Sequence, residues 1–113
     1  MSSNNTRTLR IAHLNDRLRT TLLGGKIVIT SGIGALDDAQ QAAVLSQVQC
    51  FDAFTADNDP HGEHDFGSIE LPQVGRVFWK IDYYDLCLEY GSEDPADTGI
   101  TRRVLTIMLA SEY

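Results

Sequence analysis

The sequence FGSIELPQVGRVFWKIDYYD, residues 66–85, decides the fold because it reads as a β-hairpin. Residues 66–71 and 76–83 are rich in β-branched and aromatic side chains, and Pro72-Gln-Val-Gly75 between them has the composition of a turn. Side chains alternate between the two faces of a strand, so the second strand places one set together: Val77, Trp79, Ile81 and Tyr83. This face is expected to form the core.

Two helices and one strand are predicted ahead of the hairpin. Residues 6–23 carry apolar side chains at the spacing of one helix face, and Gly24-Gly25 follow as a helix stop. Residues 26–31, KIVITS, read as a short strand. Residues 37–53 read as a second helix, with Asp37 as its N-cap.

The region after the hairpin is predicted to add one strand and one helix. Residues 86–90 read as a strand, and residues 100–112 read as a closing helix with Val104, Leu105, Met108 and Leu109 turned inward. The predicted order is α-β-α-β-β-β-α. This order describes an α+β domain over residues 6–113, with a small, mostly antiparallel sheet of about four strands covered by about three helices. Residues 1–5 are expected to be disordered.

The composition excludes several classes of protein. The chain has 113 residues, sixteen acids and nine bases, a net charge of −7, and charge is uneven along it. Residues 1–26 hold five bases and one acid, whereas residues 37–97 hold fourteen acids and two bases. An acidic chain is a poor binder of nucleic acid or of anionic membranes. Without an apolar leader or a membrane-length segment, the protein is expected in the cytoplasm, with Cys50 and Cys87 as reduced core thiols.

One loop concentrates polar side chains that are suited to chemistry. The segment DNDPHGEHD, residues 57–65, offers a candidate divalent metal site for zinc, iron or manganese: Asp59, His61, Glu63, His64 and Asp65. An EF-hand is excluded, because its eighth and twelfth positions would fall on His64 and Ser68. Two other interpretations stay open: His64 beside Asp65 as a general base, or Asx turns and a His–carboxylate bond that hold the loop on the sheet.

A second group of residues has the composition of a binding surface. It combines carboxylates with tyrosines, which are favoured at interfaces, and its members are Asp82, Tyr83, Tyr84, Asp85, Glu89 and Tyr90. Carboxylates along an edge can take the place of nucleic-acid phosphates toward a basic protein. An ordinary amphipathic sheet face is the alternative. The arginines of the first helix are expected to pair with the protein's own acids.

Four segments together resemble a known family. They are HLNDRLRTTLLGGKIVITSGI (13–33), FTADNDPHGEHDFGSIEL (54–71), VFWKIDYYD (77–85) and TRRVLTIMLASEY (101–113). They are similar to short bacterial proteins grouped as a domain of unknown function and often encoded on plasmids and other mobile elements. The resemblance implies a free-standing cytosolic bacterial domain, and it implies no catalytic roles.

These observations favour a small acidic binding protein without enzymatic activity and with no cofactor. Its concrete form is a mobile-element anti-defence inhibitor, of the anti-CRISPR or antirestriction type, that occludes the basic nucleic-acid-binding surface of a protein partner. Direct binding to nucleic acid or to membranes is not expected. The alternative is a small metal-dependent hydrolase that uses the DNDPHGEHD loop.

Overall fold

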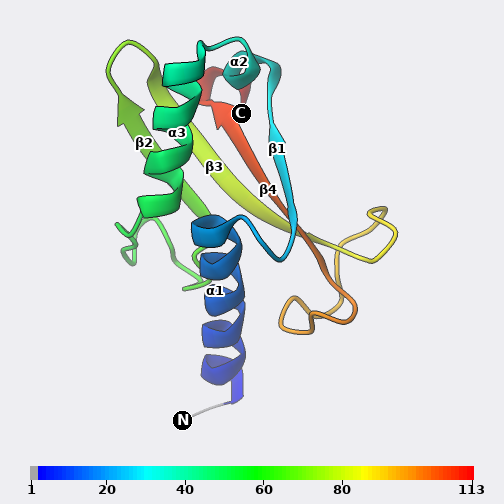
Figure 1. Ribbon diagram of the computed structural model, residues 1–113. Coiled ribbons are helices and arrows are strands. Elements are labelled where there is room, and N and C mark those ends of the chain that lie inside the picture. The colour runs from blue at the N-terminus through cyan, green and yellow to red at the C-terminus, as the bar shows by residue number, and fades with distance from the viewer. Residues whose placement is uncertain (1–2) are drawn as a thin grey trace.

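A four-stranded sheet in the order β1-β4-β3-β2 organises the chain (Figure 1). The computed structural model describes residues 3–113; the first two residues of the segment expected to be disordered, 1–5, lie outside it, and the next three begin a helix. The helices are α1 (Ser3–Thr21), α2 (Ser31–Gly34), α3 (Asp38–Cys50) and a terminal 3-10 helix, η1 (Ala110–Glu112). The strands are β1 (Lys26–Ile29), β2 (Phe66–Leu71), β3 (Gly75–Tyr84) and β4 (Arg102–Leu109).

The pairing of the strands confirms the predicted α+β class. Strand β1 runs parallel to β4, whereas β2–β3 and β3–β4 are antiparallel. The predicted hairpin is β2–β3, with Phe66 opposite Lys80 and Leu71 opposite Gly75. The sheet is therefore mostly antiparallel with one parallel pair.

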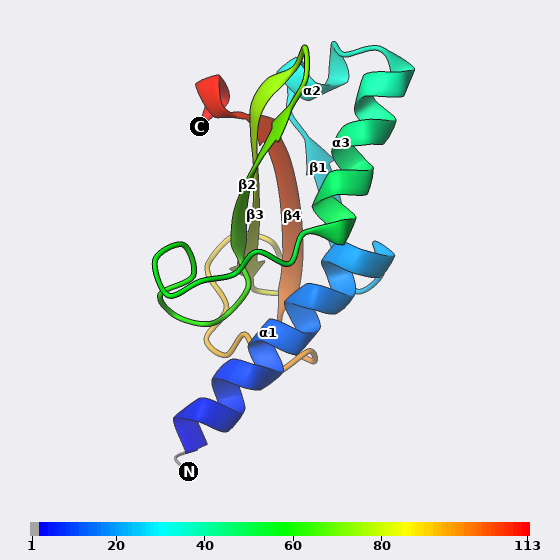
Figure 2. The same cartoon turned by 90° about the vertical axis from the view of Figure 1, so that its left-hand side faces the viewer.

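Helices α1 and α3 cover one face of the sheet (Figure 2). The core lies between these two layers, with Trp79 fully buried beside Val77, Ile81, Leu105 and Ile107. Burial of such side chains is the main favourable term in folding. The other face of the sheet is open to solvent except near the C-terminus, where the Tyr113 ring packs 5.5 Å from that of Phe78.

The predicted start of the second helix is confirmed in detail. Asp37 is the N-cap of α3: its carboxylate accepts the backbone N–H of Gln40, and the Gln40 side chain accepts the N–H of Asp37. This reciprocal capping box satisfies two N–H groups that the helix itself leaves without partners. The helix ends at Cys50, three residues earlier than predicted.

The predicted closing helix over residues 100–112 is wrong. Its main part is strand β4, the inner strand between β1 and β3, and only a 3-10 turn follows. A strand that is paired on both sides and apolar on both faces lacks clear alternation, so its apolar residues also match a helical spacing. Here Arg103, Leu105 and Ile107 are buried against the helices, while Met108 is buried on the opposite face.

The predicted strand over residues 86–90 is also wrong. These residues form turns at the start of the long connection between β3 and β4, and pairing is limited to one isolated bridge between Tyr84 and Gly91. The Asp85 carboxylate accepts the backbone N–H groups of Cys87 and Glu89, so it satisfies locally the donors that a strand would have used. Four strands are present because β4 replaces the predicted one.

Two smaller expectations have different outcomes. Cys50 and Cys87 are free cysteines as expected, but both are exposed rather than in the core. Among the described residues, every helix is too short or too polar to span a lipid bilayer.

Candidate functional site

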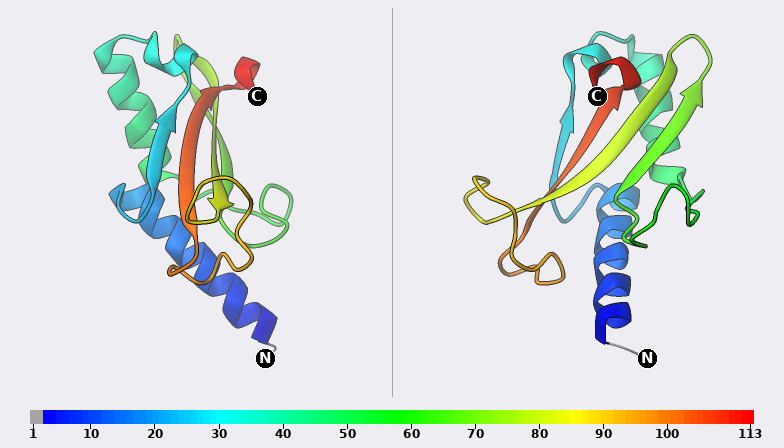
Figure 3. Two further views of the ribbon diagram at one scale, coloured as in Figure 1. Left: turned by 90° about the vertical axis from the view of Figure 1, so that its right-hand side faces the viewer. Right: turned by 180° about the vertical axis from the view of Figure 1, so that it is seen from behind.

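The two longest connections lie on either side of α1, at one end of the sheet (Figure 3). The first, residues 55–65, is the polar loop between α3 and β2. The second, residues 85–101, is the β3–β4 loop. Both contain residues that the sequence singled out, so their contacts decide which of these residues are available for function.

His64 anchors the polar loop to α1. Its Nδ1 lies 2.9 Å from Oδ1 of Asp16, and its ring stacks on Phe54 with a centroid distance of 3.9 Å and an interplanar angle of 1°. Its backbone N–H donates to Asp59, whose Oδ2 lies 3.7 Å from the second ring nitrogen, Nε2. Both ring nitrogens of His64 therefore face carboxylates of the protein itself.

Arg19, which is buried, binds the same Asp16 carboxylate as His64. It is only 3% exposed, its Nη2 donates to Asp16 at 3.1 Å, and its Nη1 donates to the Val48 carbonyl at 3.1 Å. Its guanidinium carbon lies 5.4 Å from the ring centre of Phe54 and 5.2 Å from that of Trp79. Asp16 thus joins a loop histidine to a buried arginine, so the end of α3, α1 and the polar loop are held together.

A second network of hydrogen bonds links the polar loop to β4. The Tyr83 hydroxyl donates to Oε1 of Glu63 at 2.9 Å and accepts from the amide of Asn15 at 2.7 Å. The same Asn15 amide donates to the Glu63 carbonyl, and its Oδ1 accepts from Arg103 Nε at 2.8 Å. Asn15 is fully buried, and a buried polar group of this kind costs stability unless its hydrogen bonds are made.

Burial shifts the pKa of three groups at or next to this hydrogen-bond network. Desolvation raises the pKa of Tyr83, and its hydrogen bond to Glu63 raises it further, so Tyr83 stays a neutral donor. Burial lowers the pKa of Arg103. Burial followed by the charge of Glu63 raises the pKa of Asp65.

Of the five residues predicted to bind metal, Asp59 and His64 approach each other at 3.7 Å, but the five are not gathered into one site. His61 is exposed, Glu63 bonds Tyr83, and His64 bonds Asp16 rather than its neighbour Asp65. Within residues 3–113, no three His, Cys, Asp or Glu side chains are grouped so that they would hold a metal ion. Metal binding by this loop stays a prediction, while the observed contacts are those of a loop fastened to the helix layer.

The six residues predicted to bind a partner are divided among three places. Tyr83 lies under the helix layer, whereas Asp82 and Tyr84 are on the open face, where Asp82 pairs with Lys80 at 3.1 Å. The other three belong to the β3–β4 loop: Asp85, which holds a turn, and the exposed Glu89 and Tyr90. Tyr83 is therefore separated from the others by the sheet, and partner binding by the six residues stays a prediction.

The β3–β4 loop exposes apolar side chains on a scaffold of local hydrogen bonds. Half of the large hydrophobic residues that are exposed in the described part of the chain lie in it: Leu86, Leu88, Tyr90 and Ile100. The Ser92 and Thr101 hydroxyls are 2.6 Å apart, and Asp94 forms an ion pair with Arg7 of α1 at 3.0 Å. Residues 85–101 also include five acids and neither Lys nor Arg.

Three residues that hold the polar loop in place were not among those singled out from the sequence: Asn15, Asp16 and Arg103. Asn15 carried a usable signal, because it falls four residues after Ile11 and three before Leu18, within the apolar stripe of the first helix. A polar residue on such a stripe implies a buried hydrogen-bond partner. The expected pairing of helix arginines with the protein's own acids is confirmed for Arg7 and Arg19.

The comparisons with known proteins give one match. Residues 29–112 match the family described as "Protein of unknown function (DUF3768)". No curated protein and no solved structure matches the chain. The matched region includes α2, α3, β2, β3, β4, the polar loop and the β3–β4 loop. Because the match covers most of the chain, the protein belongs to the DUF3768 family of unknown function, which confirms the family resemblance seen in its sequence.

Proposed function

We propose that this protein is a binding module whose β3–β4 loop docks on a basic surface of a protein partner. The observation that carries the proposal is the coincidence of four exposed apolar side chains and five acids in residues 85–101. Exposed apolar groups gain free energy when a partner covers them, and surrounding carboxylates select a partner of opposite charge.

The β3–β4 loop is also held in one conformation by hydrogen bonds and an ion pair before any partner binds. Its turns are held by the Asp85 carboxylate, by the Ser92–Thr101 contact and by the Asp94–Arg7 ion pair. A loop that is ordered before binding loses less conformational entropy when it docks. Tyr90 is 73% exposed and supplies a large, stiff contact surface next to Glu89.

The concrete form of the proposal is an inhibitor that occupies the nucleic-acid groove of a basic protein. Such a groove presents Lys and Arg to phosphates, and the acids of the β3–β4 loop would meet the same cations. An anti-defence inhibitor encoded on a bacterial mobile element, of the anti-CRISPR or antirestriction type, has this mechanism. The DNDPHGEHD loop carries no part of this proposal, since its contacts are internal.

The test uses the tagged protein as bait in a bacterial lysate, followed by native mass spectrometry of the eluate. Three baits are compared: wild type, Glu89→Lys, and Asp57→Lys, which reverses an exposed charge on the polar loop instead. We expect wild type and Asp57→Lys to retain a nucleic-acid-binding protein that Glu89→Lys loses.

A second measurement asks whether the captured protein is inhibited. Added wild-type protein should displace labelled nucleic acid from the purified partner, and Tyr90→Ala should do so at least tenfold less effectively. Equal capture by Glu89→Lys and Asp57→Lys would contradict the role of the loop. A partner that keeps its nucleic acid would contradict inhibition by occlusion.

A further inference from the structure

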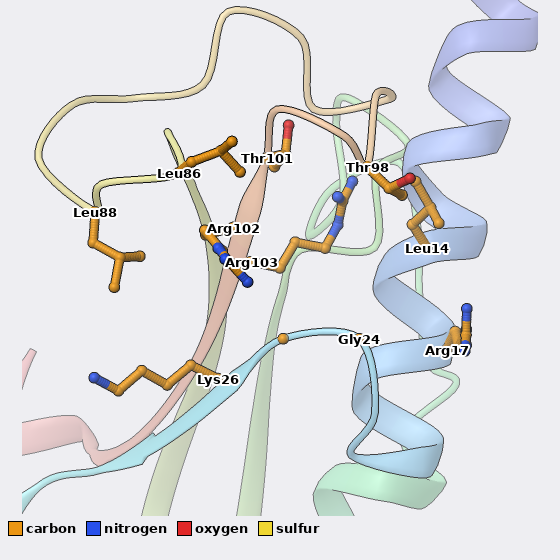
Figure 4. A pocket seen from close by; sticks show the side chains of 11 residues that line it. Leu14, Arg17, Gly24, Lys26, Leu86, Leu88, Thr98, Thr101, Arg102 and Arg103 are labelled. Atoms are coloured by element: carbon orange, nitrogen blue, oxygen red, sulfur yellow. The ribbon is translucent and has the colours of Figure 1, made fainter.

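A basic pocket of about 800 Å³ lies between α1, the start of β1 and the β3–β4 loop (Figure 4). Four cationic side chains line it: Arg17 from α1, Lys26 from β1, and Arg102 and Arg103 from β4. No Asp or Glu is among its lining residues. In a chain with a net charge of −7, this is an unusual local excess of positive charge.

Direct ion pairs in the described part of the chain do not include the cations of the pocket. Four of the nine basic side chains form ion pairs in the described part of the chain, and they are Arg7, Arg19, Arg76 and Lys80. The four that line the pocket have no such pair among residues 3–113, although the chain has sixteen acids. The lining is therefore positive overall, although Figure 4 shows the side chains of Arg17 and Lys26 extending to opposite sides of Arg102 and Arg103.

Arg103 is the buried member of this group. It is 3% exposed, and its hydrogen bonds go to the Asn15 side chain and the Pro95 carbonyl rather than to a carboxylate. Its guanidinium carbon lies 5.2 Å from the ring centre of Tyr83. These contacts fix its orientation, and within residues 3–113 the charge of Glu63 acts on it without a direct ion pair, so the buried charge is only partly compensated.

The pocket exists because β4 begins before β1. The β1–β4 ladder starts with Lys26 opposite Val104, whereas the β3–β4 ladder already includes Arg102 and Arg103. The chain enters β1 through Gly25, where a Cβ atom would lie 2.6 Å from the Arg103 carbonyl oxygen. The backbone of Gly25 lies close to β4, but β1 does not pair with Arg102 or Arg103. The side chains of these two residues therefore line this edge of the sheet.

The remaining walls of the pocket are apolar and hydroxylic. Leu86 and Leu88 line it from the β3–β4 loop and Leu14 from α1, and Figure 4 shows Arg102 between the loop leucines and the helix. Thr98 and Thr101 also line it, although the Thr101 hydroxyl is bonded to Ser92 and to the Asp94 carbonyl. A volume of this size is within the range of small-molecule sites, which combine apolar walls with a few polar anchors.

We propose that the basic pocket binds a phosphorylated small molecule of nucleotide size. Its phosphates would contact the exposed Lys26 and Arg102, the buried Arg103 would add positive potential from below, and its organic part would rest on the leucines. Arginine suits phosphate because its fork of N–H donors matches phosphate oxygens, and an arginine together with a lysine suits more than one phosphate group. This site goes beyond the protein-binding role proposed above and is tested with different variants.

The test titrates the full-length protein with ATP, inorganic tripolyphosphate and adenosine, followed by isothermal calorimetry and by amide NMR shifts. We expect ATP to bind, tripolyphosphate to bind more weakly, and adenosine to show no binding. The double variant Lys26→Gln/Arg102→Gln changes two exposed side chains, so it should fold, and it should weaken ATP binding by more than tenfold. Arg76→Gln, which removes a charge from the β2–β3 hairpin, should leave the Kd unchanged.

Three results would overturn the site. The first is no binding of ATP or tripolyphosphate at 10 mM, and the second is an equal loss of affinity in Arg76→Gln, which would mean attraction by overall charge. The third is binding of a single-stranded oligonucleotide alone, which would identify a nucleic-acid surface instead of a small-molecule pocket. Loss of partner capture in Glu89→Lys bears on none of these outcomes.

Discussion

Single residues show how tightly this small domain is packed around Trp79. Gly67 on β2 lies directly opposite Trp79 on β3, and the indole occupies the space that a side chain at residue 67 would need. A Cβ atom there would lie 2.6 Å from Cε2 of Trp79, closer than real Cβ contacts. The glycine is therefore required by packing and not by backbone conformation.

We expect Gly67→Ala to lower the free energy of unfolding by about 1–3 kcal/mol, because overpacking displaces a buried ring. Urea denaturation followed by the fluorescence of Trp79, the only tryptophan in the chain, measures it. Gly34→Ala is the matched control, since its added Cβ meets no atom closer than 3.9 Å, and it should stay within about 0.5 kcal/mol of wild type. Equal effects of the two variants would contradict this packing argument.

Asp65 is a residue whose charge opposes folding. Burial and the nearby carboxylates of Glu63 and Asp59 raise its pKa above 3.8, so the folded state favours the neutral form. Below pH 3.8 the carboxyl is protonated in both states and no penalty is present; the penalty grows as the pH rises through the folded pKa. We expect Asp65→Asn to raise the Tm at pH 7 and to lose this advantage below pH 3.8.

Thermal unfolding at several pH values checks the Asp65 prediction. Asp57→Asn, on the exposed part of the same loop, measures the effect of simply removing one negative charge from an acidic protein. A gain in Tm at pH 7 that is no larger for Asp65→Asn than for Asp57→Asn would refute the pKa argument.

At the scale of elements, the polar loop is attached to α1 rather than to the sheet alone. His64 joins Asp16 and stacks on Phe54, and Glu63 reaches Asn15 and Tyr83. The same side chains that suggested a metal site therefore act as connections between a loop and a helix. Such attachments order a segment with little apolar content of its own.

We expect His64→Ala to lower the free energy of unfolding by about 1–2 kcal/mol, because it removes a stacked ring and leaves Asp16 with one partner fewer. His61→Ala, at an exposed position, should have almost no effect, with or without a chelator. Chemical denaturation and elemental analysis of the purified variants provide the measurement. Stoichiometric zinc, iron or manganese that both substitutions remove would instead establish the metal site and reopen the hydrolase hypothesis.

At the scale of the whole molecule, the core depends on segments that are distant in sequence. The parallel β1–β4 pair joins residues 26–29 to residues 104–107, and α1 supplies the buried Ile11 and Leu18. The family match begins at residue 29, so α1 and nearly all of β1 lie outside it. In this protein those two elements complete the sheet and cover the region of Trp79.

We expect a chain of residues 29–113 to lack a fixed tertiary structure, because it loses one strand and the helix that packs Leu18 into the core. A chain of residues 6–113 should fold like the full protein. Proton–nitrogen correlation spectra distinguish the two results by their dispersion. A well-dispersed spectrum from residues 29–113 would show that the matched region is independently stable.

Local patterns were sufficient for the elements whose partners are near in sequence. The hairpin of β2 and β3, the periodic apolar face of α1 and the Asp37 cap all follow from the alternation, spacing and turn chemistry of adjacent residues. The polar loop was also identified as a loop, because eleven residues of low apolar content cannot form a core element. The fold class followed from these parts.

Contacts between residues that are distant in sequence determine the features that only the tertiary structure shows. Residues 102–109 form a strand because β1 and β3 pair with both of its edges, although the spacing of its apolar residues also fits a helix. Asp16 and Asn15 bind His64, Glu63 and Tyr83 as structural partners, and the early start of β4 places Arg102 and Arg103 in one pocket with Lys26. A one-dimensional pattern records which residues are polar or charged, whereas the partner of each is determined by the three-dimensional path of the chain.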